Sequence, residues 1–509
     1  MALGAGDPAH REAEAVVASW AAAAPKFQGW LAAGLAPAAA LLRLGSHFVQ
    51  QNEFPAAVEC LRAVTVLAPE DPAAWTNYGV ALDRAGALSE AVAALDRSLA
   101  LTPQQPDTWL LLGLTRAKLG EAAAAEAAYR VALQQDPDSA LAWQCLGLLK
   151  EGQKQYPEAI DCFLECIRRG RATAPLCANL GKLLHQTGRI PESAQAYRDA
   201  VRLDPANLYF QEMERKTLFL RAVLECPTID EALTNYRGSG ISAERGSGQD
   251  LENAFHAAFG FLSGFGHRDA AIRLGRKHLE LWPDSPSMTY LLKAVEGESV
   301  LDRAPPAYIA EHFDAFAEGF EAQLVGALGY DLPEKLGAAV RAVSDPAARY
   351  DALDAGCGTG LCGPWLRPLA RSLVGVDLAA KMLAQAAKRG LYDELICADL
   401  VGFLARSPGR FDLLAAADVL IYFGDLAPLF AAAANAVRPG GLMAVSTELK
   451  GEGTYAVLPS GRFAHSAAYV RAVAAAEWAE ISYAETTIRL EAVARVPGQI
   501  FGFRRRSAP

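Results

Sequence analysis

The fold of this chain is decided by the stretch Tyr350-Asp351-Ala352-Leu353-Asp354-Ala355-Gly356-Cys357-Gly358-Thr359-Gly360. It predicts a short buried strand, a glycine-rich turn and then a helix that begins near Leu361. Such a turn needs glycine because its backbone adopts positive φ angles and because a ligand must come close to the backbone. The carboxylate of Asp354 stands where the strand ends. The stretch therefore predicts a ligand site at the end of a strand.

A second apolar run, 372–376, ends on Asp377, seventeen residues after Gly360. A carboxylate at the end of the second strand of a βαβ unit can accept hydrogen bonds from both hydroxyls of a ribose. The expected ligand is therefore a nucleoside.

The spacing of the turn separates two classes of nucleoside ligand. A dinucleotide fold requires Gly-x-Gly-x-x-Gly, and this chain has Leu361 in place of the third glycine. Asp354 would oppose a pyrophosphate, whereas it would attract a sulfonium and an α-ammonium group. The pattern favours S-adenosylmethionine over NAD.

Apolar runs alternate with helical segments from Tyr350 onward. The runs lie near 351–355, 373–377, 394–398, 411–419 and 441–447. This alternation predicts a doubly wound, Rossmann-like parallel sheet. Two late β-like runs, about 479–493 and 499–503, are expected to add an antiparallel pair at one edge.

The first half of the chain repeats every 34 residues. Tryptophan, glycine, alanine, leucine or aromatic residues, and proline recur at this step: Trp75, Trp109, Trp143; Gly45, Gly79, Gly113, Gly147, Gly181; Ala57, Ala91, Ala125, Ala159; Leu61, Leu95, Tyr129, Phe163, Tyr197; Pro69, Pro103, Pro137, Pro205. This is the tetratricopeptide period, in which each unit is a pair of antiparallel helices. Small residues let the helices pack closely, and proline ends the second one. The pattern predicts an all-α solenoid.

The chain divides into five parts on these patterns. They are a helical N-terminal cap (1–37), five tetratricopeptide repeats (38–206), a helical linker with a degenerate repeat (207–300), lid or entrance helices (301–349) and the α/β domain (350–509).

Composition limits the classes of partner. The 509 residues are too many for one ordinary domain, and the net charge of −10 argues against a nucleic-acid partner. Nine cysteines without framework spacing fit a reducing compartment. The N-terminus lacks a signal-like pattern, and no apolar run is long enough to span a membrane. We expect a cytoplasmic protein.

The solenoid is expected to bind an extended peptide or a partner protein along its first helices, which is the usual use of such arrays. This partner is also a candidate for the substrate. The positions counted as facing this groove are mostly neutral or apolar, for example Leu110, Leu148 and Ala178. The alternative is that the array binds its own catalytic domain or another copy of the chain.

The second half resembles the class I S-adenosylmethionine-dependent methyltransferases over roughly Pro306 to Arg505. The resemblance is carried by the glycine turn, by Asp377, by Asp399-Leu400 after the third strand and by Pro439-Gly440-Gly441 before the fifth. It implies S-adenosylmethionine as cofactor, held by Asp354, Gly356, Gly358, Gly360, Asp377, Leu378, Met382, Asp399, Leu400 and Asp418. Met382 would pack on adenine, although it is equally expected in the core. The whole chain is similar to bacterial proteins that fuse tetratricopeptide repeats to such a methyltransferase.

Methyl transfer needs orientation and, for some acceptors, a base. His465 is the preferred candidate for this base because imidazole titrates near neutral pH. The rival interpretation is that His465 only lies beside a helix cap and has no chemical role. Tyr422 is a second catalytic candidate, and Arg462 and Tyr469 are expected to bind the acceptor. No metal site is predicted, since Cys162 and Cys166 have no further ligand cluster.

Two classes of function follow. The first is methyl transfer to an oxygen or nitrogen of a small molecule, or of a peptide or protein recruited by the repeats. The alternative is an interaction scaffold whose methyltransferase fold is structural or senses the cofactor. DNA methylation is disfavoured, because Ala417-Asp418-Val419-Leu420 differs from the Asn/Asp-Pro-Pro-Tyr of amine-directed enzymes.

Overall fold

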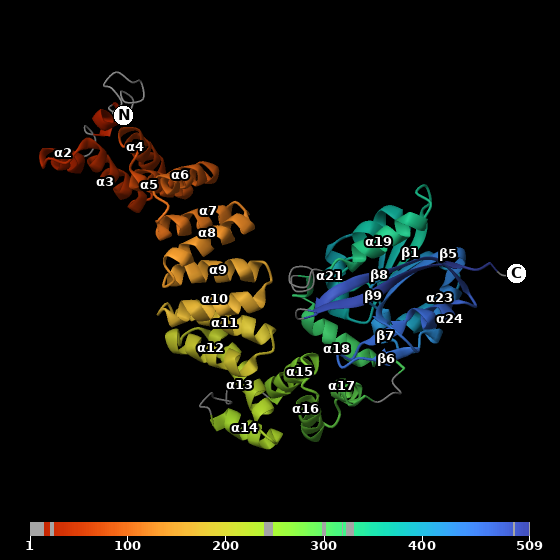
Figure 1. Ribbon diagram of the computed structural model, residues 1–509. Coiled ribbons are helices and arrows are strands. Elements are labelled where there is room, and N and C mark those ends of the chain that lie inside the picture. Colours follow the sequence, from red (N-terminus) through yellow and green to blue (C-terminus); the bar gives the residue numbers. More distant parts are fainter. Residues whose placement is uncertain are drawn as a thin grey trace. The chain divides into compact units, whose positions relative to one another are not determined.

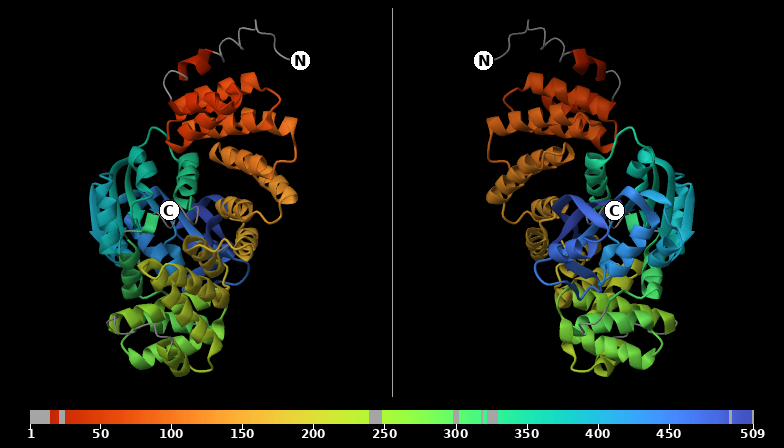
Figure 2. Two further views of the ribbon diagram at one scale, coloured as in Figure 1. Left: turned by 90° about the vertical axis from the view of Figure 1, so that its left-hand side faces the viewer. Right: turned by 90° about the vertical axis from the view of Figure 1, so that its right-hand side faces the viewer.

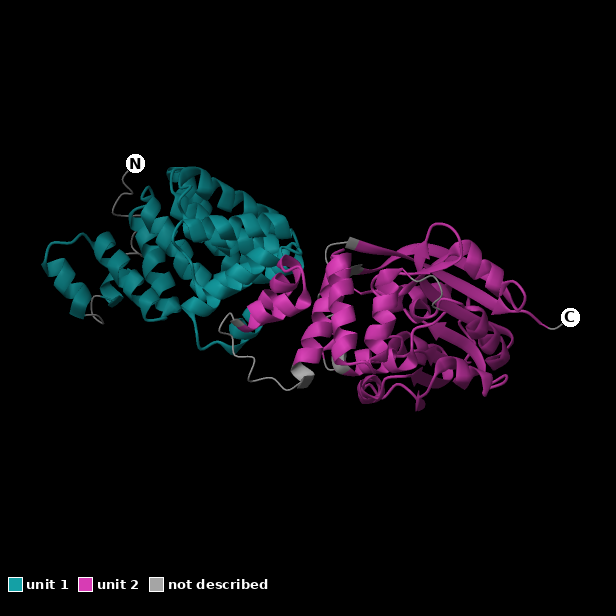
Figure 3. Ribbon diagram, turned by 90° about the horizontal axis from the view of Figure 1, so that it is seen from below, with its two compact units in different colours: residues 1–214 teal, residues 215–509 magenta. Residues whose placement is uncertain are grey.

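The computed structural model describes residues 15–20, 25–238, 248–297, 302–317, 319–321, 330–491 and 494–507. The chain divides into two compact units, residues 1–214 and residues 215–509 (Figure 3). Within the described ranges, no helix combines the length and the apolar character needed to cross a membrane.

Unit 1 is a stack of helix pairs, which can be followed in Figure 1 and Figure 2. Its described helices are α2 (Pro25–Ala32), α3 (Pro37–Gln50), α4 (Phe54–Leu67), α5 (Pro72–Ala85), α6 (Leu88–Leu101), α7 (Pro106–Lys118), α8 (Ala122–Gln135), α9 (Ala140–Gly152), α10 (Tyr156–Arg168), α11 (Ala174–Gln186) and α12 (Ile190–Leu203). The pairs from α3 to α12 confirm the predicted solenoid. Residues 1–14 and 21–24 of the predicted cap lie outside the described residues.

The repeat glycines are required by close contact between the two helices of each pair. A Cβ atom on any of them would lie 2.5–2.8 Å from a large side chain of the second helix. The pairs are Gly45–Leu61, Gly79–Leu95, Gly113–Tyr129, Gly147–Phe163 and Gly181–Tyr197. The recurring glycine and the recurring leucine or aromatic residue are therefore two halves of one contact.

The repeat tryptophans join each helix pair to the turn before it. In each case the indole Nε1 donates to the carbonyl oxygen of the repeat proline: Trp75 to Pro69 at 2.9 Å, Trp109 to Pro103 at 2.9 Å and Trp143 to Pro137 at 3.0 Å. Gln211 continues the contact after the fifth unit, since its Nε2 donates to the oxygen of Pro205 at 2.7 Å. The hydrogen bond to the repeat proline is therefore also made where glutamine replaces tryptophan.

Two apolar positions counted as facing the predicted groove belong to the core instead. Leu110 and Ala178 are each 6% exposed, whereas Leu148 is 45% exposed. The 34-residue period predicts the helices, whereas the burial of a side chain on them depends on how neighbouring helices pack.

Unit 2 begins with helices and ends with a sheet. Its helices before the sheet are the end of α13 (Leu208–Glu225), α14 (Ile229–Gly238), α15 (Gly248–Gly264), α16 (Arg268–Leu281), α17 (Pro286–Glu296), α18 (Pro306–Phe316) and α19 (Leu332–Val343). Helices α15 and α16 occupy the region predicted as a degenerate repeat.

The sheet has a parallel centre and an antiparallel edge. Strands β1 (Tyr350–Ala355), β2 (Ala370–Asp377), β3 (Glu394–Cys397), β4 (Phe411–Ala416) and β5 (Val437–Lys450) run parallel in the order β3-β2-β1-β4-β5. Strand β9 (Ala494–Arg505) pairs antiparallel with β5 and with β8 (Trp478–Glu491). This confirms the doubly wound sheet with its antiparallel edge.

Both faces of the sheet are covered by helices. Alternate strand residues Ala352, Leu413 and Leu442 share a cluster with α19. Their neighbours Leu353, Leu414 and Met443 face the other way and share a cluster with α22 (Leu400–Ala405) and α23 (Ala427–Ala436). Three further described α-helices of this domain are α20 (Gly363–Leu366), α21 (Ala380–Lys388) and α24 (Ala467–Ala474). Burial on both faces is why the strands are nearly continuous apolar runs.

Two features differ from the expectation. The helix after the glycine turn begins at Gly363 and has only four residues, because Pro368 follows closely and cannot continue it. Two short strands, β6 (Tyr455–Val457) and β7 (Phe463–Ser466), were not predicted. Strand β7 pairs parallel with the end of β5, so His465 lies in a strand rather than at the start of a helix.

The helix contact in the repeats can be tested by adding one methyl group. Gly147→Ala would place Cβ 2.5 Å from the Phe163 ring. We expect the free energy of unfolding to fall by about 1–3 kcal/mol, as is typical of overpacking. The measurement is urea unfolding of the full chain followed by helical circular dichroism. Gly152→Ala is the matched control on the same helix, since its Cβ would meet nothing within 4 Å; equal destabilisation by both variants would contradict the explanation.

Candidate functional site

A cavity of about 360 Å³ lies at the carboxyl ends of β1, β2 and β4. Its walls come from the glycine turn, from the loops after β2 and β4, and from α18. This is the edge at which doubly wound sheets bind ligands. Every residue that forms it belongs to unit 2.

The glycine turn has the geometry that the sequence predicted. Gly356, Gly358 and Gly360 have φ angles of 67°, 54° and 86°. A Cβ on Gly356 would lie 2.4 Å from Val419, whereas one on Gly358 would meet nothing within 4 Å. Gly358 lines the cavity, so its bare backbone is open to a ligand.

Asp354 is a buried carboxyl group beside this turn. Its side chain lines the cavity, the residue is 1% exposed, and the Tyr392 hydroxyl donates to its Oδ2 at 2.6 Å. Burial raises the pKa of Asp354 to about 7, helped by the charge of Asp377, while the hydrogen bond from Tyr392 acts in the opposite direction. The group therefore titrates near neutral pH.

Asp377 connects the glycine turn to the loop after β2. Its Oδ2 accepts from the backbone N–H of Gly358 and its Oδ1 from that of Ala379, both at 2.9 Å. Burial raises the pKa of Asp377, and these backbone hydrogen bonds oppose the rise. Asp377 also lines the cavity.

Most of the residues expected to hold the cofactor line this one cavity. They are Asp354, Gly356, Gly358, Asp377, Leu378, Met382, Leu400 and Asp418. Gly360 and Asp399 are not among the lining residues. Asp399 instead caps α22, because its Oδ1 accepts from the Gly402 N–H at 2.9 Å, and it pairs with Arg303, which does line the cavity.

A buried ion cluster forms the wall after β4. Arg489, with its side chain 3% exposed, lies 3.2 Å from Asp418 and also pairs with Glu448. Asp418 adopts a φ of 59°, which is uncommon for a residue other than glycine. Arg489 comes from β8, 71 residues along the chain, and its Nη1 donates to both carboxylate oxygens of Asp418.

The predicted catalytic and acceptor residues separate into two groups. Tyr422 and Arg462 line the cavity, and a hydrogen bond from Arg462 acts on the Tyr422 hydroxyl. His465 and Tyr469 are not in its walls. The His465 Nε2 lies 3.2 Å from the oxygen of Gly424, and burial lowers the pKa of His465 to about 4. Tyr469 stacks on that imidazole and bonds to Asp425 at 3.0 Å.

Several polar cavity residues were not among the predicted site residues, including Thr359, Arg303, His312 and Arg489. Thr359 lay inside the glycine turn, so its place beside the ligand could have been predicted from the sequence. His312 lay in the region predicted as lid or entrance helices, 301–349. Arg303 and Arg489 are distant in sequence from every motif, and only the folded chain brings them to the site.

Comparison with protein families identifies both parts of the chain. Models described as tetratricopeptide repeat match residues 42–106, 106–149 and 146–207. A model described as methyltransferase domain matches residues 353–445, which include the glycine turn and β5.

Curated relatives match within the sheet domain. The chain is 33% identical over 109 residues to a ubiquinone biosynthesis O-methyltransferase of Thiobacillus denitrificans, covering 20% of this chain and 46% of the relative. It is 33% identical over 110 residues to the protein of that name in Albidiferax ferrireducens, covering 20% and 42%. The chain thus spans less than half the length of these relatives.

Among solved structures, a magnesium protoporphyrin IX methyltransferase from Synechocystis with bound SAM has a TM-score of 0.28 and 19% identity, covering 34% of this chain and 78% of that one. The family matches and the fold lead to one conclusion. The chain carries tetratricopeptide repeats in its N-terminal part and a methyltransferase domain in its C-terminal part.

Proposed function

We propose that this chain is an S-adenosylmethionine-dependent methyltransferase that acts on an oxygen atom of its acceptor. The observation that carries the proposal is the buried Asp354 carboxyl at the glycine turn, one loop away from the ribose-type acid Asp377. An anionic group in an apolar wall attracts a cation, whereas it would repel a pyrophosphate. The curated relatives, which are named as O-methyltransferases, support oxygen over nitrogen.

The residues of the cavity fit this cofactor. Asp354 suits its cationic part and Asp377 its ribose, while Leu378 and Met382 offer apolar surface for a base. Thr359 adds a buried hydroxyl oxygen for which the described residues provide no hydrogen-bond partner. A bound amino-acid group would satisfy that hydroxyl, which otherwise carries a desolvation penalty. When bound, S-adenosylmethionine supplies a methyl group activated by its sulfonium.

The acceptor is assigned to the side of the cavity formed by His312, Tyr422 and Arg462. Arg462 supplies a guanidinium that can orient a carboxylate or phosphate of the acceptor. Burial, together with the positive charge of Arg462, lowers the pKa of His312 to about 4. The imidazole is therefore neutral at pH 7, and one of its ring nitrogens can accept the proton of the acceptor hydroxyl.

His312 replaces His465 in this proposal because it lines the cavity and His465 does not. Tyr422 is proposed to lie beside the acceptor. Tyr469 is given no role in the reaction. The repeats are proposed to bring a peptide or protein to the domain, as tetratricopeptide repeats generally mediate protein interactions. A cytoplasmic location remains part of the proposal.

Cofactor binding separates an enzyme from a structural methyltransferase fold. In isothermal titration, we expect S-adenosylmethionine to bind the full chain in one-to-one ratio. Asp377→Ala should weaken binding at least tenfold, because it removes both the ribose acceptor and the two backbone hydrogen bonds of the loops. Glu452→Ala, an exposed acid outside the cavity, is the control and should bind normally. Absence of binding by the parent chain would reject the enzyme and the sensor alike.

The charge of Asp354 should make this affinity depend on pH. Above its pKa of about 7 the carboxylate attracts the cofactor, and below it the neutral carboxyl does not. Affinity should therefore fall as pH decreases from 8 to 6, by up to about tenfold per unit below the pKa. Asp354→Asn should bind weakly at every pH.

Tyr392→Phe sharpens that experiment. Its hydroxyl lowers the pKa of Asp354, so its removal should move the midpoint of the affinity curve to higher pH without removing the curve. A constant affinity between pH 6 and pH 8 for the parent chain would contradict the role given to Asp354.

The base can be tested once label transfer is seen. The full chain is incubated with methyl-labelled cofactor and cell lysate, and the label is sorted into protein and small-molecule fractions. His312→Asn should slow transfer about 100-fold or more, as expected for loss of a general base, with cofactor affinity unchanged. His267→Asn, which lies outside the cavity, should transfer at the normal rate. Weakened cofactor binding by His312→Asn would show that the residue positions the cofactor instead.

A further inference from the structure

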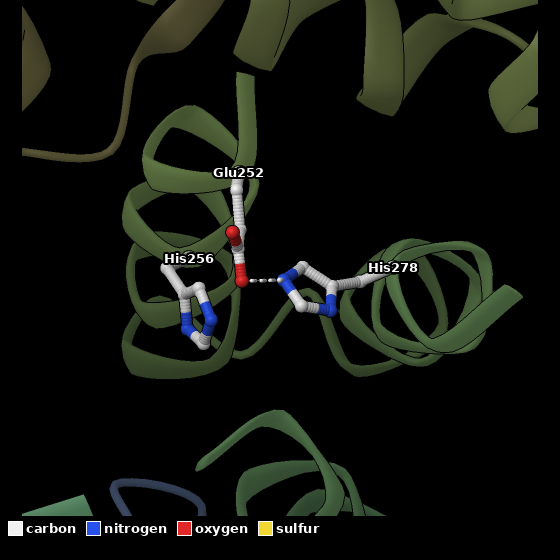
Figure 4. A group of neighbouring side chains, drawn as sticks. All are labelled: Glu252, His256 and His278. Atoms are coloured by element: carbon white, nitrogen blue, oxygen red, sulfur yellow. Dashed lines mark ion pairs between the residues drawn. The ribbon is translucent and has the colours of Figure 1, made fainter. Parts of the chain in front are cut away.

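A second cluster of chemically active side chains lies away from the cavity, on helices α15 and α16. Glu252 and His256 project from α15 and His278 from α16, and Figure 4 shows the three turned toward one another. One ligand atom from each lies within 4.8 Å of the others. The Glu252 Oε1 and the His278 Nε2 are 3.8 Å apart, and the two imidazole centroids are 4.6 Å apart. None of the three lines the cavity.

His278 is an unusual residue to bury in this way. Its side chain is fully buried, and neither ring nitrogen has a hydrogen-bond partner within the described part of the chain. A buried polar group without a partner costs about 1–3 kcal/mol, and nearly all such groups in proteins are satisfied. We therefore expect the Nε2 atom of His278, which points toward Glu252 (Figure 4), to have a binding partner.

Aromatic packing alone does not account for this arrangement. The His278 ring lies 4.8 Å from the Trp282 ring and 6.1 Å from that of Phe255, so its faces have apolar neighbours. Those contacts would be made equally by a phenylalanine or leucine. Those contacts do not explain why the residue carries ring nitrogens, or why His256 and Glu252 lie close to them.

The ligand set has the chemistry of a metal site. Two imidazoles and one carboxylate form a known ligand set for zinc, with the fourth position left for water or another ligand. Glu252 and His256 stand four residues apart and share one face of α15. Ligands at about 2.0–2.1 Å from a tetrahedral ion lie roughly 3.4 Å apart, so the Glu252–His278 contact needs little closing.

The protonation state also suits ligation. Burial, together with the neighbouring His256, lowers the pKa of His278 to about 4. Burial lowers the pKa of His256 as well, although Glu252 and Glu311 oppose the shift. Both imidazoles are therefore neutral at pH 7, which is the form that binds metal ions.

We propose that Glu252, His256 and His278 bind one divalent metal ion of the zinc class, and that this ion joins α15 to α16. Glu311 on α18 lies near enough to act on His256 and accepts from the Ser287 hydroxyl at 2.8 Å. It is placed to orient His256 or a metal-bound water from outside the ligand set. Because α18 also carries Ile309, His312 and Phe313 of the cavity wall, the ion would hold a helix that the methyl-transfer site uses.

Metal titration of the full chain tests the proposal. The protein is stripped with a chelator and titrated with Zn²⁺ against a chromophoric competitor, and separately with Co²⁺. We expect one equivalent to bind, with a visible cobalt spectrum typical of tetrahedral coordination. The near-ultraviolet band of a cobalt–thiolate bond should be absent. Its presence would show that one or more of the nine cysteines of the chain bind the metal instead.

Variants then assign the site. Glu252→Gln and His256→Gln should each weaken Zn²⁺ binding more than about 100-fold, beyond the effect usual for an outer partner. Both side chains are partly exposed, so these variants are expected to fold. His267→Gln is the matched control: His267 lies in the turn between the same two helices, at the N-cap of α16, where its side chain makes no capping hydrogen bond, and the variant should bind as the parent does.

Thermal unfolding gives an independent measurement. Zn²⁺ should raise the melting temperature of the parent and of His267→Gln, and should leave those of Glu252→Gln and His256→Gln unchanged. Absence of stoichiometric binding, a thiolate band, or unchanged affinity in both variants would overturn the proposal. Cofactor titration of the same samples reports the methyltransferase site separately, so failure of one proposal is distinguishable from failure of the other.

Discussion

The two hydrogen bonds accepted by Asp377 are the interaction on which the candidate site depends. One comes from Gly358 in the glycine turn and the other from Ala379 at the start of the loop after β2. They join two loops that are separate in sequence and hold their backbones at a fixed spacing. Because both loops line the cavity, a single carboxylate joins two parts of its wall. The negative charge of Asp354 is then set against a wall whose geometry is already fixed.

The main features of the fold were predictable because each rests on a local pattern. The 34-residue period predicted the solenoid, and the contact between Gly147 and the Phe163 ring explains why the small and large positions recur together. The alternation of apolar runs predicted the parallel sheet. Strands β6 and β7 escaped because each is four residues or shorter and lacks a period that could be read.

The cofactor side of the site was also predictable, whereas the acceptor side was not. Asp354 and Asp377 lie at the carboxyl ends of their own strands, so their positions depend only on the βαβ pattern. His465 was chosen for its chemistry, but its place in β7 beside β5 buries its ring against the Gly424 carbonyl. Arg489 reaches the cavity from β8 through strand pairing, which no short stretch of sequence records.

The buried cluster of Asp418, Glu448 and Arg489 has a consequence for how this domain can change over time. Asp418 holds a left-handed backbone that glycine or asparagine would adopt more easily. Replacing it alone would leave Arg489, which is 3% exposed, short of one counter-charge, and replacing Arg489 alone would leave two acids facing each other. Single steps at any of these positions are therefore costly, and drift is expected to proceed through compensating changes. Among related chains, the three positions should vary as a set.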